Sequence, residues 1–299
     1  MKWLFYAVAT PFLNSLDSLG EKLLIDKHVK NAIVIVFNEG LIFLIFGLSI
    51  LLWHKVEILS FTQTSILLLS GMLFIYYLIP YFKALKSEET SRVIPLFQFI
   101  PIIVLVLSYV FLHELISGKQ ILGFFVVFAG AFLLSAEKLD AKIFRPRKAF
   151  WYMLFSSFLY GLTPILFKFI VVNTDFWTAF FYQAIGGGIG AVTLFVYSPY
   201  RRAFVNESLK LPFKSWGIMT LNQVATVVAE LSASFAFSIA PVALVSVVTG
   251  TQPLFTLIFA IILSRFFPQI IKENISKGAL GIKFSSIFLI LVGISLIYL

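Results

Sequence analysis

Ten stretches of this sequence are long and apolar enough to cross a membrane as helices. A spanning helix needs about 20 mostly apolar residues. The chain is 60% hydrophobic and only 12% charged, whereas about 25% of the residues in soluble domains are charged. So few charges cannot cover a water-facing surface. We therefore predict an all-α integral membrane protein with spans at residues 3–25, 31–53, 65–85, 93–113, 119–136, 149–172, 176–197, 214–237, 243–264 and 279–298.

A pattern of prolines and glycines occurs twice, about half the chain apart. Pro101 and Gly130 in the first copy correspond to Pro253 and Gly293 in the second, which has a longer last turn. A segment that recurs in this way indicates two copies of one structural unit.

Five spans in each copy have a topological consequence. Because five is odd, the second copy must enter the membrane in the opposite orientation, as in the inverted repeats of many secondary transporters. We therefore predict a ten-helix protein built from two inverted five-helix repeats, residues 1–137 and 149–299, joined by a basic linker at residues 138–148.

The net charge of +9 is concentrated between the spans. The connections after odd-numbered spans hold 17 of the 23 lysines and arginines. Cytoplasmic loops carry such an excess, so this count places both termini outside. Basic loops beside anionic lipid explain the charge without a nucleic-acid partner.

One set of residues points to a known family. It comprises Tyr81, Phe82, Lys83, Ala84, Leu85, Ser91, Pro95, Leu96, Pro101, Glu114, Gly123 and Gly130, and then Ala236, Ala240, Pro241, Val242, Ala243, Gln252, Pro253 and Gly293. With these residues the chain resembles, over nearly its whole length, the EamA-type ten-helix transporters of the drug/metabolite transporter superfamily. Two features depart from the family pattern. Arg265 and Phe266 stand where an acidic residue is common, and family members commonly have the N-terminus inside.

The resemblance implies a secondary active transporter in a bacterial or archaeal cell membrane. Such a carrier moves small polar or amphipathic metabolites, for example amino acids or related compounds, by alternating access. Export with protons as the coupling ion is the expected direction and driving force. Membrane lipid is the other expected partner, and the chain is expected to act as a monomer or homodimer. Two alternatives stay open: a ligand-binding sensor or scaffold without transport, and a flippase for a lipid-linked substrate.

Polar side chains inside the apolar spans are the candidates for substrate or proton contacts, because a charge at the centre of a membrane costs at least about 2.5–3.5 kcal/mol. In the first span Asn14, Asp17, Ser18 and Glu21 share one helix face. We expect this face to point into the protein, with Asp17 and Glu21 along the substrate path. The alternative for Glu21 is contact with headgroups and water.

Three further charged residues lie within the spans. Glu39, next to Asn38, either contacts the substrate or forms a buried ion pair with Lys22. Glu230, which shares a helix face with Gln223 and follows Asn222, is the preferred proton or substrate carboxylate. The alternative for Glu230 is a protonated side chain hydrogen-bonded to a neighbouring helix. Lys168 either reaches the interface or anchors an anionic substrate group.

Neutral polar side chains could add further substrate contacts or join helices. They are Tyr81, Gln98, Tyr160, Gln183 and Gln252. Pro101 and Pro253 are candidates for helix kinks used in gating, with helix packing as the alternative. The glycines at positions 186, 187, 188 and 190 indicate close helix packing.

The sequence contains no signature of an enzyme or a cofactor site. It has no cysteine, its three histidines lack metal-ligand spacing, and no phosphate-binding loop of the ATPase type occurs. We therefore expect neither a metal nor another cofactor.

Overall fold

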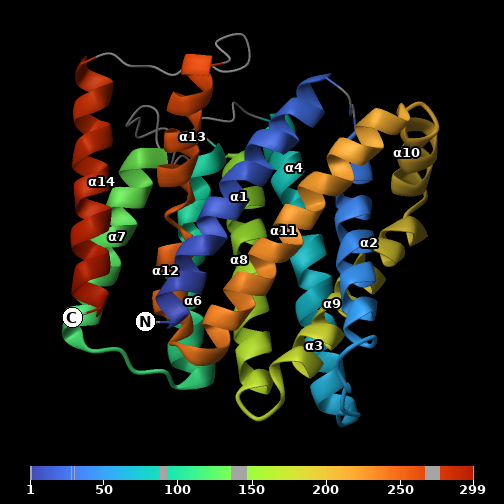
Figure 1. Cartoon of the computed structure of the whole chain (residues 1–299), viewed down its shortest axis with the longest axis horizontal. Helices are drawn as coiled ribbons and strands as arrows, with labels where there is room; N and C mark the ends of the chain where they lie inside the picture. Colours follow the sequence, from blue (N-terminus) through green and yellow to red (C-terminus); the bar gives the residue numbers. More distant parts are fainter. Residues whose placement is uncertain are drawn as a thin grey trace.

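The structure is a computed structural model that describes residues 2–27, 29, 31–87, 93–135, 147–266 and 277–298, without the side chains at 21–23, 25–27, 135, 263–266, 277–280 and 282. Every regular element in these ranges is a helix, and no strand occurs among them (Figure 1). This confirms the all-α prediction for the described part of the chain. Most of the predicted basic linker at 138–148 lies outside the described residues.

The first half of the chain forms one series of helices. They are α1 (Lys2–Lys27), α2 (Ile33–Ile50), α3 (Phe61–Tyr76), α4 (Leu78–Ser87), the 3-10 helix η1 (Ile94–Gln98), α6 (Phe99–Leu112) and α7 (Gly118–Ser135).

The second half forms another series of helices. It consists of α8 (Lys148–Val171), α9 (Phe176–Thr193), the 3-10 helix η3 (Leu194–Val196), α10 (Ser198–Ser208), α11 (Phe213–Ile239), α12 (Val242–Thr249), α13 (Gln252–Phe266) and α14 (Lys277–Tyr298). Each predicted span coincides with one of these helices or with two consecutive ones. The helix α10 was not predicted. It lies in a polar connection, begins with a proline in its first turn and buries no residue.

Within the described ranges, six helical stretches are long and apolar enough to cross a membrane. They are Ile33–Ile50, Phe61–Ser87, Ile94–Leu112, Lys148–Val171, Phe176–Val196 and Val242–Ile262. Gly118–Leu134 and Lys283–Tyr298 are shorter apolar helices. The two helices with rows of polar side chains, α1 and α11, are not among the six. A total of ten spans therefore stays a prediction.

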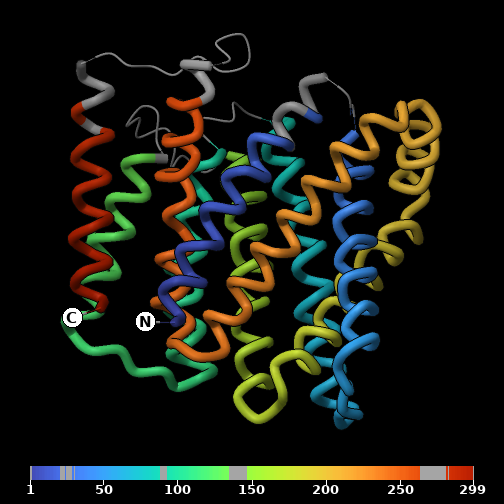
Figure 2. Tube along the Cα trace, viewed as in Figure 1, coloured from blue at the N-terminus to red at the C-terminus, as the bar shows by residue number. Residues whose placement is uncertain are grey.

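The helices form a bundle in which neighbours along the chain alternate in direction. Figure 2 shows both termini on one side, with α1 leaving that side and α8 running toward it. The same opposition relates α2 to α9 and α7 to α14.

The main helix contacts join the two halves. The helix α1 packs against α11, α12 and α13, and α8 packs against α3, α4, η1 and α6. In addition α2 packs on α9, α6 on α12 and α7 on α14. Figure 1 shows α1 and α11 side by side across the front of the bundle.

The predicted packing role of the α9 glycines is confirmed. A Cβ atom on Gly186 would lie 2.2 Å from the Leu68 carbonyl oxygen of α3, and one on Gly187 would lie 2.4 Å from the Phe43 ring of α2. These are closer than van der Waals contact allows, so only glycine lets α9 lie between α2 and α3. Around this contact Phe43, Phe74 and Phe180 form part of a buried apolar cluster.

Two spans are divided into two helical pieces near the repeated prolines. Pro101 lies in the first turn of α6, directly after η1, and Pro253 lies in the first turn of α13, directly after the break at Gly250 and Thr251. A proline in a first turn sacrifices no helical hydrogen bond, because that N–H has no partner within the helix. The prolines thus begin a helix after each break, and their role in gating stays a prediction.

Candidate functional site

The polar face of α1 meets two helices of the second half. The Asn222 side-chain amide of α11 donates hydrogen bonds to the carbonyl oxygen of Asp17, at 3.1 Å, and to its carboxylate. The Thr226 hydroxyl, one turn further along α11, donates to the Asn222 carbonyl at 3.4 Å. Asp17 therefore lies in the contact between α1 and α11.

Other residues of the same face contact α13. The Gln252 side-chain amide donates to the Ser18 hydroxyl at 2.8 Å and to the Asn14 carbonyl at 3.2 Å. Ser15 donates to the Gln252 carbonyl at 3.0 Å. The predicted orientation of this polar face, toward the protein interior, agrees with these bonds. The side chains of Glu21 and Lys22 lie outside the described residues, so the expected pairing of Lys22 with Glu39 does too.

A second polar group lies deeper, between α2, α8 and α11. Asn38 and Glu39 are each 3% exposed, Gln223 is 0% exposed and Glu230 is 7% exposed. Glu39 and Glu230 both act electrostatically on the hydroxyl of Tyr160, which indicates that α2, α8 and α11 present these side chains to a common region. The sequence indicated Glu39, Tyr160 and Glu230 as separate candidates, and the fold brings these three near one another.

Several polar atoms of this group have no hydrogen-bond partner among the described residues. They include the Asn38 side-chain nitrogen and both amide atoms of Gln223. Leaving a buried polar group unpaired costs about 1–3 kcal/mol. Ser234, on the same helix, donates to the Glu230 carboxylate at 3.5 Å. No described hydrogen bond joins Glu230 to a neighbouring helix.

The neutral polar candidates mostly join helices. Gln183 donates to the Ser70 hydroxyl at 3.2 Å, and Ser70 donates to the Thr163 carbonyl at 3.0 Å, which links α9, α3 and α8. Gln98 donates to the Gly250 carbonyl at 3.1 Å, at the break between α12 and α13.

Aromatic rings border the buried polar group. The ring of Tyr160 lies edge-to-face with Tyr77 at 4.7 Å. Tyr81 of α4 packs against Phe97 of η1, with ring centroids 4.9 Å apart.

Lys168 forms its hydrogen bonds with the protein backbone. Its ammonium group donates to the carbonyl oxygens of Phe237 at 2.8 Å, Ser238 at 3.1 Å and Ala240 at 3.2 Å. A lysine has three donors, so in this conformation none is left for an anionic substrate. Glu114, which was not a candidate, binds the next helix, because its carboxylate accepts from the Val242 backbone N–H at 2.7 Å. Its place in the family pattern and at the end of an apolar span marked it, but neither indicates this role.

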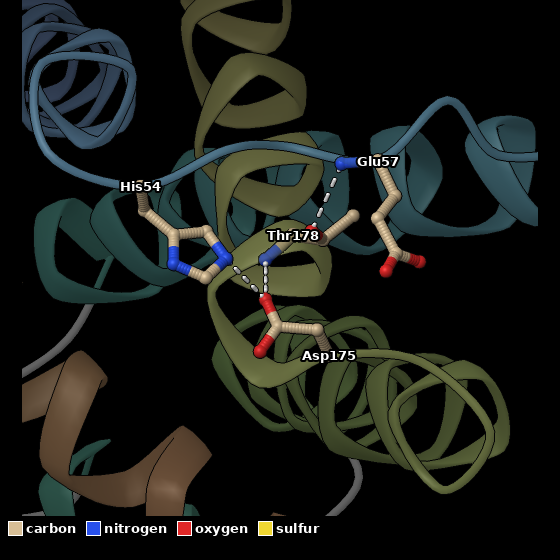
Figure 3. Close-up of polar contacts among 4 residues, drawn as sticks. All are labelled: His54, Glu57, Asp175 and Thr178. Atoms are coloured by element: carbon tan, nitrogen blue, oxygen red, sulfur yellow. Dashed lines mark hydrogen bonds and ion pairs between the residues drawn. The ribbon is translucent and has the colours of Figure 1, made fainter.

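An ion pair joins the two halves on the side where the termini lie. Figure 3 shows His54, in the connection between α2 and α3, directed at Asp175, the N-cap residue of α9; the two atoms are 2.7 Å apart. The Asp175 carboxylate also accepts from the Thr178 backbone N–H at 2.9 Å. The Thr178 hydroxyl in turn accepts from the Glu57 backbone N–H at 3.2 Å.

These contacts set the sign of a pH effect. Partial burial would raise the pKa of Asp175, but the hydrogen bonds from Thr178 and His54 and the charge of His54 together hold it below its ordinary value. A carboxyl group with a lowered pKa stabilises the fold above its unfolded-state pKa, and this stabilisation is lost as the pH falls through the folded-state pKa.

Replacing Asp175 by alanine is therefore expected to cost about 1 kcal/mol of stability at neutral pH, the usual value of a helix N-cap. The difference between parent and variant should shrink in acid, as the pH falls through the lowered folded-state pKa of Asp175, and what remains is the capping bond that a protonated carboxyl still accepts from the Thr178 N–H. Thermal unfolding of both proteins across pH measures it. Asp175→Asn, which keeps an acceptor for Thr178 but loses the charge, should be intermediate. A cost that does not change with pH would contradict this account.

The described residues contain no group of three or more His, Asp or Glu side chains that could hold a metal ion. What the described site offers is buried carboxylates, amides and phenols between helices of the two halves. Such groups can exchange a proton and form hydrogen bonds with a polar solute.

Comparison with known proteins agrees with this description. A solved crystal structure, titled only as that of a protein, covers 99% of this chain and 96% of its own, with a TM-score of 0.71 and 13% identity. At this identity the likeness concerns the fold alone. No curated protein matches the sequence closely enough to count as a relative.

Residues 1–136 match the EamA-like transporter family. The six apolar helical stretches and this match fit a multi-pass integral membrane transporter. This likeness, over residues 1–136, is to the EamA-like transporters of the drug/metabolite transporter superfamily.

Proposed function

We propose that this protein is a secondary transporter in which two inverted five-helix halves enclose a path for a small polar or amphipathic metabolite. The substrate contacts the buried polar group between α2, α8 and α11, and the two halves rock to expose that group to either side of a cell membrane. Proton movement drives the transport, in the direction of export.

The pattern of helix contacts supports the inverted halves. Suppose that each helix takes the place of its counterpart in the other half. The counterparts are α1 and α8, then α3 with α4 and α11, and then η1 with α6 and α12 with α13. The contacts of α1 with α11, α12 and α13 then become the contacts of α8 with α3, α4, η1 and α6. The contacts between α2 and α9 and between α7 and α14 map onto themselves. The opposite directions of α1 and α8 and of α2 and α9 in Figure 2 fit the same exchange. A twofold arrangement of this kind is what places a binding site between repeats.

One observation carries the proposal: the unpaired buried amide of Gln223 on the same helix face as Glu230. Both its polar atoms are buried without a described partner, at a cost of about 1–3 kcal/mol for each unsatisfied group. A polar substrate that binds between the halves would satisfy this amide and Asn38. Glu230 and Glu39 supply negative charge at the same place, and Asp17 lines the neighbouring contact of α1 with α11.

Flux in proteoliposomes tests this function. The purified protein is reconstituted, and a panel of amino acids and their analogues is offered with and without a pH gradient. Saturable flux that collapses when the gradient is removed is the expected result. Saturable binding without flux would instead identify a sensor. A toxicity screen with the same compounds, in cells with and without the protein, selects the panel.

The flippase alternative receives no support from the described surface. An open groove on the outside of the bundle is lined by Leu4, Phe5, Val8, Ala9, Phe12, Phe255 and Tyr298. It contains no charged side chain that could bind a lipid headgroup. Its composition suits contact with acyl chains of the surrounding membrane.

A further inference from the structure

The junction between α11 and α12 is contacted by two side chains of opposite charge. Lys168 of α8 binds the carbonyl oxygens at the end of α11, at 2.8–3.2 Å. Glu114, in the connection between α6 and α7, binds the first N–H of α12 at 2.7 Å. The two charges also attract each other. Between them lie only Ala240 and Pro241, which belong to neither helix.

Each charge is at the helix end that favours it. The carbonyl groups at a helix C-terminus carry partial negative charge and the N–H groups at an N-terminus carry partial positive charge. Lys168 meets the first kind of end and Glu114 meets the second. Because the N-cap residue Pro241 has no side-chain acceptor, the carboxylate of Glu114 accepts the free Val242 N–H and so caps α12.

The backbone of the connection after α6 is shaped to deliver Glu114. His113 has a left-handed conformation with φ 53°, the only one of a non-glycine residue in the described chain. This turn lets the Glu114 N–H return to the Ser108 carbonyl at 3.3 Å. Left-handed residues end helices in this way, but a residue other than glycine, asparagine or aspartate is uncommon there. The left-handed turn thus places the Glu114 side chain against the start of α12.

The junction lies within a dense apolar cluster where the two halves meet. Phe237, Ala240 and Ala243 are buried there together with Ala7 of α1 and Val104 of α6. In Figure 1 this end of α11 and α12 is on the same side as both termini. Apolar side chains of this cluster therefore pack between the halves at this point.

We propose that Lys168 and Glu114 are positioning residues that clamp the α11–α12 junction, and that this clamp must release before the path opens toward the side of the termini. Glu114 belongs to the first half and the junction to the second, so the clamp holds one half against the other. The opening step rests on the proposed transport function. The clamp itself does not, because it can be measured without substrate.

The absence of cysteine from the sequence makes single-cysteine labelling a direct test. Ala243→Cys, in the buried cluster beside the junction, reports on the side of the termini, and Ala84→Cys, buried near the end of α4, reports on the opposite side. Each reporter is combined with Lys168→Met or with Glu114→Gln. The second variant keeps an acceptor for the Val242 N–H and removes only the charge, so it serves if Lys168→Met does not fold. Lys119→Met, which removes an exposed lysine at the start of α7, is the matched control.

Both clamp variants should raise the rate at which a soluble maleimide labels Ala243→Cys in detergent by about tenfold, the effect of losing one charge-assisted contact. The rate at Ala84→Cys should stay the same or fall, and Lys119→Met should change neither rate. An equal increase at both reporters would show general loosening of the fold and overturn the proposal, as would unchanged labelling. Selective labelling in a protein that transports nothing would leave the clamp in place and refute only the transport function.

Discussion

The Glu230→Gln variant is expected to fold and insert like the parent protein but to lose gradient-driven flux down to the level of empty vesicles. Glutamine has nearly the same shape as glutamate and forms similar hydrogen bonds, but it cannot bind or release a proton. Glu230 is 7% exposed, and a neutral amide is less costly to bury than a carboxylate. The thermal stability of the Glu230→Gln variant should therefore equal or exceed that of the parent protein. Flux in proteoliposomes and thermal unfolding measure the two effects.

Exchange without a gradient separates the two roles that Glu230 could have. If Glu230 carries only the coupling proton, the variant should still exchange labelled for unlabelled substrate across the membrane. If it contacts the substrate, exchange should be lost as well. Glu57→Gln is the matched control, because Glu57 is exposed and its described contacts involve only its backbone. Gradient-driven flux that is unchanged in Glu230→Gln would remove this residue from the mechanism.

The helices of this protein could be predicted because an apolar segment in a bilayer has few stable backbone conformations. In a bilayer, backbone groups must find partners within the chain, and an apolar segment of about 20 residues can do so only as a helix. The polar face of α1 could be predicted for a related reason. Asn14, Asp17 and Ser18 recur at helical spacing, and a polar face on a spanning helix is stable only inside the protein. The bonds of this face to α11 and α13 agree with that argument.

The partners of these residues could not be predicted from sequence. Asp17 meets Asn222 across 205 residues of chain, and helical spacing says nothing about contacts between distant helices. Lys168 shows the same limit more clearly. Its partners are backbone carbonyls, which every residue possesses, so no side-chain pattern marks them. The role of Glu114 depends on a left-handed turn at His113, and histidine is not the residue that usually indicates such a turn.

The largest expected effect on folding comes from the smallest substitution, Gly71→Ala. A Cβ atom at this position of α3 would lie 1.8 Å from the Gln183 carbonyl oxygen and 2.6 Å from the Gly187 nitrogen of α9. Both are backbone atoms, which cannot move without displacing the whole of α9. Overpacking within a core costs about 1–3 kcal/mol when side chains can adjust. Here they cannot, so we expect at least the upper end of that range.

Gly217→Ala is the matched control and should have the opposite sign. Gly217 lies in α11, and a Cβ atom there would meet nothing within 4 Å. Alanine is a better helix former than glycine by about 1 kcal/mol, so this variant should be slightly more stable than the parent. Thermal unfolding and the yield of monodisperse protein in detergent compare the two. The contact of α3 with α9 joins the two halves of the protein, so Gly71→Ala should push these halves apart. A Gly71→Ala variant as stable as the parent would show that α3 and α9 do not lie this close.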